Sequence, residues 1–186
     1  MDMSMDERAQ GLILLDRDDQ RLIRKSNDVI DYRDPEFQKF IDDLILCGDE
    51  HQGVGIAAPQ VGKSIRLFIM APKPNPRYPD APEMPPTAII NPEILSVSEA
   101  KEKGWEGCLS VPGFRGQVPR HLEINVAYQD RFGEKRTTRF SGFLARLFQH
   151  EFDHLEGVLY PTRMEEGDAL VTLEEFTALT GIVVSA

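Results

Sequence analysis

The sequence Gln149-His150-Glu151-Phe152-Asp153-His154-Leu155-Glu156-Gly157 places two histidines four positions apart. We expect an α-helix here that begins after its cap Ser141 and ends near Glu156, because glycine and proline follow. Residues four apart share one face of a helix, so both imidazoles can reach one metal ion. Glu151, beside the first histidine, can take a proton from water on that metal. The alternative is a helix end with two surface histidines, where cations are favoured.

A zinc or iron site needs a third protein ligand and an open position besides these two histidines. No further histidine follows them, and Glu165 and Glu166 are downstream candidates that nothing around them supports. Upstream, Cys108 stands in Trp105-Glu106-Gly107-Cys108-Leu109-Ser110-Val111-Pro112-Gly113, a stretch that we interpret as a loop. Its glycines allow the backbone to come close to a ligand. The sequence therefore favours Cys108 as the third ligand.

A second helix is expected nearer the N-terminus, beginning at Asp34-Pro35 and ending near Gly48. Aspartate caps a helix, and proline is tolerated in its first turn. Apolar residues then recur at three- and four-residue spacing, which is typical of an amphipathic helix; they are Phe37, Phe40, Ile41, Leu44 and Ile45. Cys47 lies on this helix, and we interpret it as a small buried hydrophobic residue.

The segments between the two helices are predicted to form strands. The expected strands span residues 65–70, 87–91, 93–97, 122–128 and 135–140, and residues 130–133 form a hairpin turn between the last two. Residues 71–86 hold seven prolines, which forbid a helix or a central strand, so this segment is expected to be a surface loop. Strands followed by a helix predict the α+β class.

Composition narrows the class of protein. The chain has 186 residues, of which 41% are hydrophobic, so one domain over residues 1–186 is expected. Its net charge of −10 argues against a nucleic-acid partner. No apolar stretch approaches the ~20 residues of a membrane helix. The acidic, polar residues 1–10 resemble neither a signal nor a transit peptide. Two cysteines are too few for a disulfide framework, and we expect a cytoplasmic protein.

Three motifs together resemble those of the peptide deformylase family. They are residues 53–62 (Gly-Val-Gly-Ile-Ala-Ala-Pro-Gln-Val-Gly), 106–112 and 149–157, in the family's order. The resemblance covers about residues 12–162, and residues 104–113 are similar to a branch shared by some bacterial and organellar members. It implies an enzyme that removes the formyl group from the N-terminal formyl-methionine of new polypeptides and releases formate. We predict antiparallel strands packed around a central helix that carries the two histidines.

The resemblance also implies a role for each matched residue. Cys108, His150 and His154 bind one divalent metal, and a water on the metal is the nucleophile. Glu151 acts as general base and then as general acid, while Gln60 and the backbone N–H of Leu109 hold the developing oxyanion. A thiolate favours iron, zinc, cobalt or nickel over magnesium. The resemblance implies Fe²⁺ in the cell, with Zn²⁺, Ni²⁺ or Co²⁺ as substitutes.

Substrate contacts follow from the same resemblance. Backbone near Val54, Gly55 and Gly107 pairs with an extended N-formylmethionyl peptide, a form of strand addition that needs little sequence preference. Arg115 stands where the family has an arginine at the active-site rim; the alternative is a solvated surface charge.

The pocket for the methionine side chain departs from familiar members at one position. Val54, Phe143 and Leu147 provide apolar lining, but Arg146 stands where an aliphatic residue is usual. We expect its stem to line the pocket and its guanidinium to lie in water.

The end of the chain, residues 164–186, is an acidic tail with five acids and no base. Residues 173–176 are expected to form a short helix. Some family members dock on the ribosome through a basic C-terminal helix. Because the tail here has no basic residue, we do not expect this mode of docking. The sequence leaves the oligomeric state open.

Two other functions compete with the deformylase interpretation. A general metallopeptidase is disfavoured by the cysteine ligand and the glycine-rich motif. A non-enzymatic member with a vestigial metal site is disfavoured by Glu151 and Gln60, which are both intact.

Overall fold

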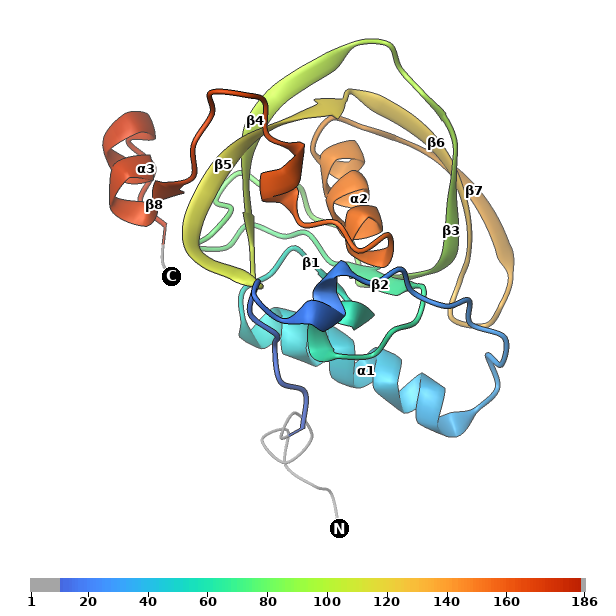
Figure 1. Cartoon of the computed structure of the whole chain (residues 1–186). Helices are drawn as coiled ribbons and strands as arrows, with labels where there is room; N and C mark the ends of the chain where they lie inside the picture. Colours follow the sequence, from blue (N-terminus) through green and yellow to red (C-terminus); the bar gives the residue numbers. More distant parts are fainter. Residues whose placement is uncertain (1–10, 185–186) are drawn as a thin grey trace.

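Strands surround one central helix in the computed structural model, which describes residues 11–184 (Figure 1). The helix is α2 (Gly142–Leu155), which carries both histidines of the first motif. All pairings between the named strands are antiparallel. The predicted α+β class and the central position of this helix are therefore confirmed.

The strands form two separate sheets. The first has the order β1-β2-β3-β6-β7 and the second the order β4-β5-β8. The bounds are β1 (Gly55–Ala57), β2 (Leu67–Met70), β3 (Thr87–Val97), β4 (Lys101–Cys108), β5 (Val111–His121), β6 (Glu123–Gln129), β7 (Lys135–Ser141) and β8 (Val171–Thr172). In this order β1 and β4 are edge strands, so each has a side that no strand of its sheet covers.

The short strands β1 and β2 separate two helices. Side chains alternate along β2: Phe68 and Met70 join the apolar cluster around α2, whereas Leu67 and Ile69 join the cluster packed against α1 (Pro35–Glu50). Because both faces of β2 are covered, its four residues are all buried. The N-terminus of α1 is capped as expected, since the Asp34 carboxylate accepts the N–H of Glu36. This packing fixes β1 beside α2.

Two strand predictions need correction. The expected strands 87–91 and 93–97 are one strand, β3, whose pairing with β6 shifts between Ile90 and Glu93. Pro92 lies between them and has no N–H to donate, and Asn91 has a φ of 48°, so the backbone is irregular here without ending the strand. The stretch around Cys108, interpreted as a loop, instead forms the end of β4 and the start of β5.

The boundaries of α1 and α2 agree with the prediction, but the predicted cap of α2 does not act as one. Ser141 occupies the N-cap position of α2, but its side chain makes no capping hydrogen bond. Helix α2 ends at Leu155, and Gly157 follows with a φ of 75°. The predicted short helix in the tail is longer than expected and forms α3 (Leu173–Thr180).

Short 3₁₀ turns complete the described chain: η2 (Gln20–Ile23), η3 (Ala58–Val61) and η4 (Tyr160–Arg163). No helix within residues 11–184 has the length and apolar character that crossing a bilayer requires. The acidic segment 1–10 and the last two residues of the tail, 185–186, lie outside the described residues.

Candidate active site

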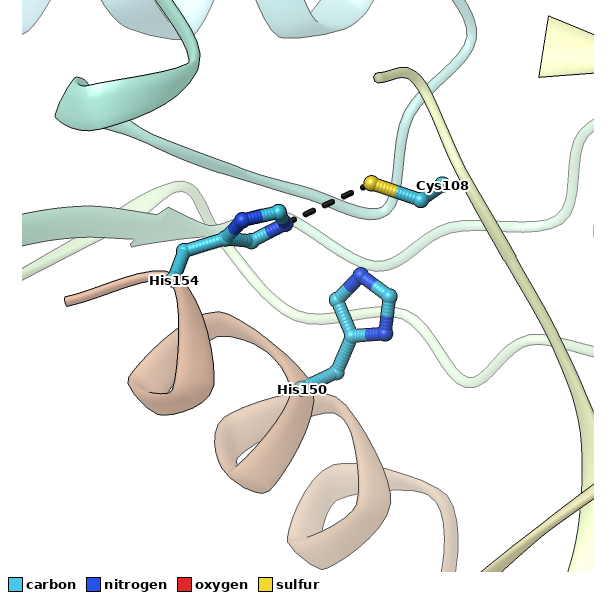
Figure 2. A group of neighbouring side chains, drawn as sticks. All are labelled: Cys108, His150 and His154. Atoms are coloured by element: carbon cyan, nitrogen blue, oxygen red, sulfur yellow. Dashed lines mark hydrogen bonds between the residues drawn. The ribbon is translucent and has the colours of Figure 1, made fainter. Parts of the chain in front are cut away.

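Two elements bring together three side chains that could hold a metal ion (Figure 2). His150 and His154 project from α2 toward Cys108, the last residue of β4. One ligand atom from each lies within 4.8 Å of the others, and the Cys108 Sγ is 3.4 Å from the His154 Nε2. No other group of three such side chains occurs within residues 11–184. The downstream alternatives Glu165 and Glu166 are not part of it.

Glu106 orients the first of these imidazoles. Its Oε1 lies 2.8 Å from the Nδ1 of His150, so the ring nitrogen that remains, Nε2, is the one available to a metal. The carboxylate is buried and also accepts hydrogen bonds from Arg120 at 2.9 and 3.0 Å. Burial would raise the pKa of Glu106, but hydrogen bonds from His150 and Arg120 outweigh it and hold the pKa well below its usual range.

A chain of charged side chains extends from Glu106, next to the group formed by Cys108, His150 and His154. Arg120 also donates to the carboxylate of Asp153 at 2.7 Å. Arg163 donates to the other oxygen of Asp153 at 2.8 Å. The network thereby joins β4, β5, α2 and η4. This role of Asp153 could not be predicted from the sequence, because the two unassigned positions between the histidines give no signal by themselves.

The environment of Cys108 favours a thiolate. Burial raises the pKa of this thiol, but the charges of His154 and His150 outweigh burial and place the pKa well below its usual value. The backbone N–H of Ser110 points to the sulfur at 3.4 Å, and the side-chain amide of Gln60 at 3.5 Å. An anionic sulfur with two imidazole nitrogens is a donor set that suits a transition-metal ion. The residues present therefore fit such an ion.

Glu151 is a buried carboxylate beside this group. Its Oε2 has no hydrogen-bond partner, and burial raises its pKa to about 7. Gly55 of β1 is part of the reason that the carboxylate fits: a Cβ there would lie 2.6 Å from the Glu151 Oε1. A carboxyl group with a pKa near neutrality can both accept and return a proton.

Gln60 is held in one orientation. Its Oε1 accepts the N–H of Ala57 at 2.8 Å, so the amide nitrogen faces Ser110 and Cys108. Leu109, the other residue predicted to contact the oxyanion, lines the same cavity as Gln60.

That cavity has a volume of about 240 Å³ and lies between the edge strands β1 and β4. Of the substrate residues predicted from the sequence, those that line it are Val54, Gly55, Gly107, Phe143 and Leu147. Arg115 does not line this cavity. It is buried next to Gly107, where a Cβ would overlap its guanidinium, and it borders a neighbouring cavity that also touches Cys108 and Leu109.

The expected solvent position of the Arg146 guanidinium is wrong. Arg146 does line the cavity, but its guanidinium donates to Glu106 at 2.8 Å and to the carbonyls of Val118 and Glu102, each at 2.7 Å. These acceptors on β4 and β5 replace water. A Cβ at Gly104 would lie 2.8 Å from the same guanidinium, so this glycine leaves the space that Arg146 fills.

Two aromatic residues of the cavity wall were not predicted. Tyr78 comes from the proline-rich segment that we interpreted as a surface loop, and its hydroxyl donates to the carbonyl of Gly107 at 3.1 Å. Trp105 of β4 lies two residues before Gly107. The proline-rich composition concealed Tyr78, and Trp105 lies in the stretch quoted around Cys108 but was assigned no role of its own.

Comparisons with known proteins agree with this geometry. The polypeptide deformylase family model matches residues 12–169. Peptide deformylase 2 of Nostoc sp. is 53% identical over 158 residues, which cover 85% of this chain and 88% of that protein. Peptide deformylase 2 of Ralstonia nicotianae is 44% identical, with coverage of 82% and 86%.

Solved structures show the same fold. The Met-Ala-Ser-bound class I type b peptide deformylase of Acinetobacter baumannii has a TM-score of 0.78 and 44% identity, and the match covers 82% of this chain and 98% of that one. The Thermotoga maritima peptide deformylase has a TM-score of 0.75 and 37% identity, with coverage of 83% and 97%. On the strength of the family match, the relatives and the shared fold, this chain belongs to the polypeptide deformylase family.

Proposed function

We propose that this chain hydrolyses the formyl amide of N-formylmethionyl peptides and releases formate. The observation that carries the proposal is the buried carboxylate of Glu151, whose Oε2 has no hydrogen-bond partner, beside Cys108, His150 and His154. The Met-Ala-Ser tripeptide in the Acinetobacter baumannii structure has the sequence that such a reaction would leave.

The metal, when bound by Cys108, His150 and His154, supplies Lewis acidity and makes hydroxide available near neutral pH. Glu151 takes the proton from the attacking water and delivers it to the amine that leaves. Its burial supports this role, because a pKa of about 7 lets it exchange a proton at physiological pH.

Gln60 and Leu109 stabilise the negative charge that develops on the formyl oxygen. The amide of Gln60 is a neutral donor whose orientation is set by the Ala57 N–H. The backbone N–H of Leu109 is the second donor. Removing a donor of this kind typically costs roughly 3–4 kcal/mol in the transition state.

The peptide lies as an extended strand between β1 and β4. Backbone groups of Val54, Gly55 and Gly107 pair with it, which gives affinity without strong sequence preference. The methionine side chain enters the cavity among Val54, Phe143 and Leu147, and Arg146 closes that cavity on the β4 side. Arg115 supports the wall behind Gly107.

Ferrous iron is the proposed native metal, one ion per chain, with zinc, nickel or cobalt as substitutes, because a thiolate with two imidazoles suits these ions. We further propose that residues 1–186 form one catalytic domain with an acidic tail at 164–186, and that the protein acts in the cytoplasm.

Formate release from formyl-Met-Ala-Ser tests the proposal, using anaerobically purified protein loaded with iron or nickel. We expect formate from this peptide and no peptide-bond cleavage in its unformylated twin, whereas a general metallopeptidase would cleave the latter. Absence of formate from the loaded protein would contradict the proposal.

Glu151→Gln separates proton transfer from metal binding. We expect the variant to bind metal normally and to lose at least about 100-fold in kcat, the range typical of a removed general base. Glu166→Gln, an exposed acid elsewhere on the chain, is the matched control and should keep both properties. Full turnover of metal-loaded Glu151→Gln would show that Glu151 is not the base.

A further inference from the structure

The segment after residue 169 lies beyond the family match and packs on the outer side of the β4–β5 hairpin (Figure 1). Its helix α3 has well-formed ends. Thr172 and Glu175 form a reciprocal capping box at its start, and Gly181 with a φ of 73° follows its last residue. Caps of this kind stabilise a short helix and define where it begins and ends. Helix α3 is therefore a well-formed element of the fold.

Two kinds of contact attach this segment to the hairpin. Strand β8 pairs with β5, with Arg115 opposite Val171. Before it in the chain, Asp168 and Glu165 form ion pairs with Lys103 of β4 at 2.7 and 2.9 Å. Residues 165–172 are thus tied to both strands of the hairpin whose edge faces the cavity.

Phe176 of α3 reaches the two side chains that back this edge. It is 5% exposed, and its ring meets the Trp105 indole edge-on at 5.3 Å between centroids. The Arg115 guanidinium carbon lies 5.9 Å from the same ring. Trp105 lines the cavity, and Arg115 lies directly behind Gly107. One ring therefore contacts both side chains next to the proposed substrate edge.

We propose that Phe176 is a positioning residue for the peptide: it holds Trp105 and Arg115 in place and so presets the β4 edge for the incoming chain. An edge-to-face pair and a cation over a ring both constrain orientation. Without the ring, both side chains have space to turn away. The inference rests on the proposed placement of the peptide between β1 and β4, and Phe176 itself touches no reacting atom.

The matched variants are Phe176→Ala, Phe176→Tyr and Leu179→Ala in the full-length, metal-loaded enzyme. Tyrosine restores the ring, and Leu179 is a residue of the same helix that is 67% exposed. For Phe176→Ala we expect KM for formyl-Met-Ala-Ser to rise roughly five- to tenfold with kcat within about twofold, since binding common to ground and transition states is lost. Phe176→Tyr and Leu179→Ala should match the wild type, and metal content should not change.

Fluorescence gives a second readout, because Trp105 is the only tryptophan of the chain. Phe176→Ala should move its emission to longer wavelength, and Phe176→Tyr should restore it. If Phe176→Ala does not fold, Phe176→Leu keeps apolar volume without the ring and should still raise KM.

Three outcomes would overturn the inference: unchanged KM in Phe176→Ala, equal losses in Leu179→Ala, or a failure of Phe176→Tyr to restore KM. An inactive wild-type enzyme would instead contradict the proposed function, so the two failures are distinguishable.

Discussion

Glu106 has more charged partners than any other carboxylate described around the metal-binding group. It holds the Nδ1 of His150 and accepts hydrogen bonds from Arg120 and Arg146. A buried carboxylate between two guanidiniums is stabilised as the anion, and removing it leaves those cations without a partner. The orientation of the His150 imidazole and the stability of the fold therefore both depend on one side chain.

We expect Glu106→Gln to lower the free energy of unfolding by about 3 kcal/mol at pH 7, since it breaks a buried ion pair. The folded-state pKa of Glu106 is depressed from its usual 4.5. Its contribution is thus complete above about pH 4.5 and is lost as the pH falls toward the folded pKa. At pH 3.5 the difference between wild type and variant should be about 1 kcal/mol smaller.

Urea denaturation of chelator-treated proteins measures this difference at both pH values, without a contribution from metal loss. Glu102→Gln is the control, because its carboxylate is exposed on the same strand. A difference that does not change with pH would contradict the ionic role of Glu106.

Residues with a local chemical signature could be predicted from the sequence, and residues that depend on a neighbour could not. Spacing alone placed His150 and His154 on one helix face, and the structure brings Cys108 to them. The position of the Arg146 guanidinium depends on carbonyls of β4 and β5, which are distant in sequence. No pattern around Arg146 carries that information.

The C-terminal end of α2 is in close contact with the N-terminal part of the chain. Gly157 follows the helix with a φ of 75°, and a Cβ there would lie 2.6 Å from the backbone carbon of Ile23. Ser26 donates its N–H to the carbonyl of Leu155. The element that carries both histidines is thereby held at its end by residues 23–26.

Gly157→Ala should destabilise the fold more than the same change at Gly167. Both glycines have positive φ, so alanine at either costs about 1–2 kcal/mol in backbone strain. Only Gly157 also meets backbone atoms, because nothing lies within 4 Å of a Cβ at Gly167. Thermal unfolding should show a larger fall in Tm for Gly157→Ala, and equal falls would show that the contact with Ile23 relaxes at no cost.

Elements differ in how far their own residues specify them. The apolar spacing and the Asp34 cap predicted α1 nearly to its observed bounds. The hairpin of β4 and β5 was missed because its glycines, prolines and charges do not alternate. Strand β5 tolerates Pro119, because beyond Phe114 and Arg115 it pairs only with β4. The pairing of β5 with β8 joins segments that are far apart in the sequence, so the sequence alone does not specify it.

At the scale of the whole molecule, a metal held by Cys108, His150 and His154 would tie the smaller sheet to the central helix. Anything that binds the folded state alone stabilises it, by about 2.7 kcal/mol when the ligand is at 100 times its Kd. For a chain of this size that is a shift of roughly 5–10 °C.

We therefore expect chelation to lower the Tm of the wild type by roughly 5–10 °C. Cys108→Ala should bind little metal and show almost no response to the chelator. Cys47→Ala is the matched control, since Cys47 is the other buried cysteine and lies on α1. Calorimetry with and without chelator measures the shifts, and an equal response in both variants would contradict the assigned ligand.

The two sheets end in edge strands, β1 and β4, on opposite sides of one cavity. A peptide paired with both edges would complete a single hydrogen-bonded sheet from β7 through to β8. Peptide binding would then affect all the strands of the β-structure rather than one loop. Release of the product would require the continuous sheet to separate into two sheets again.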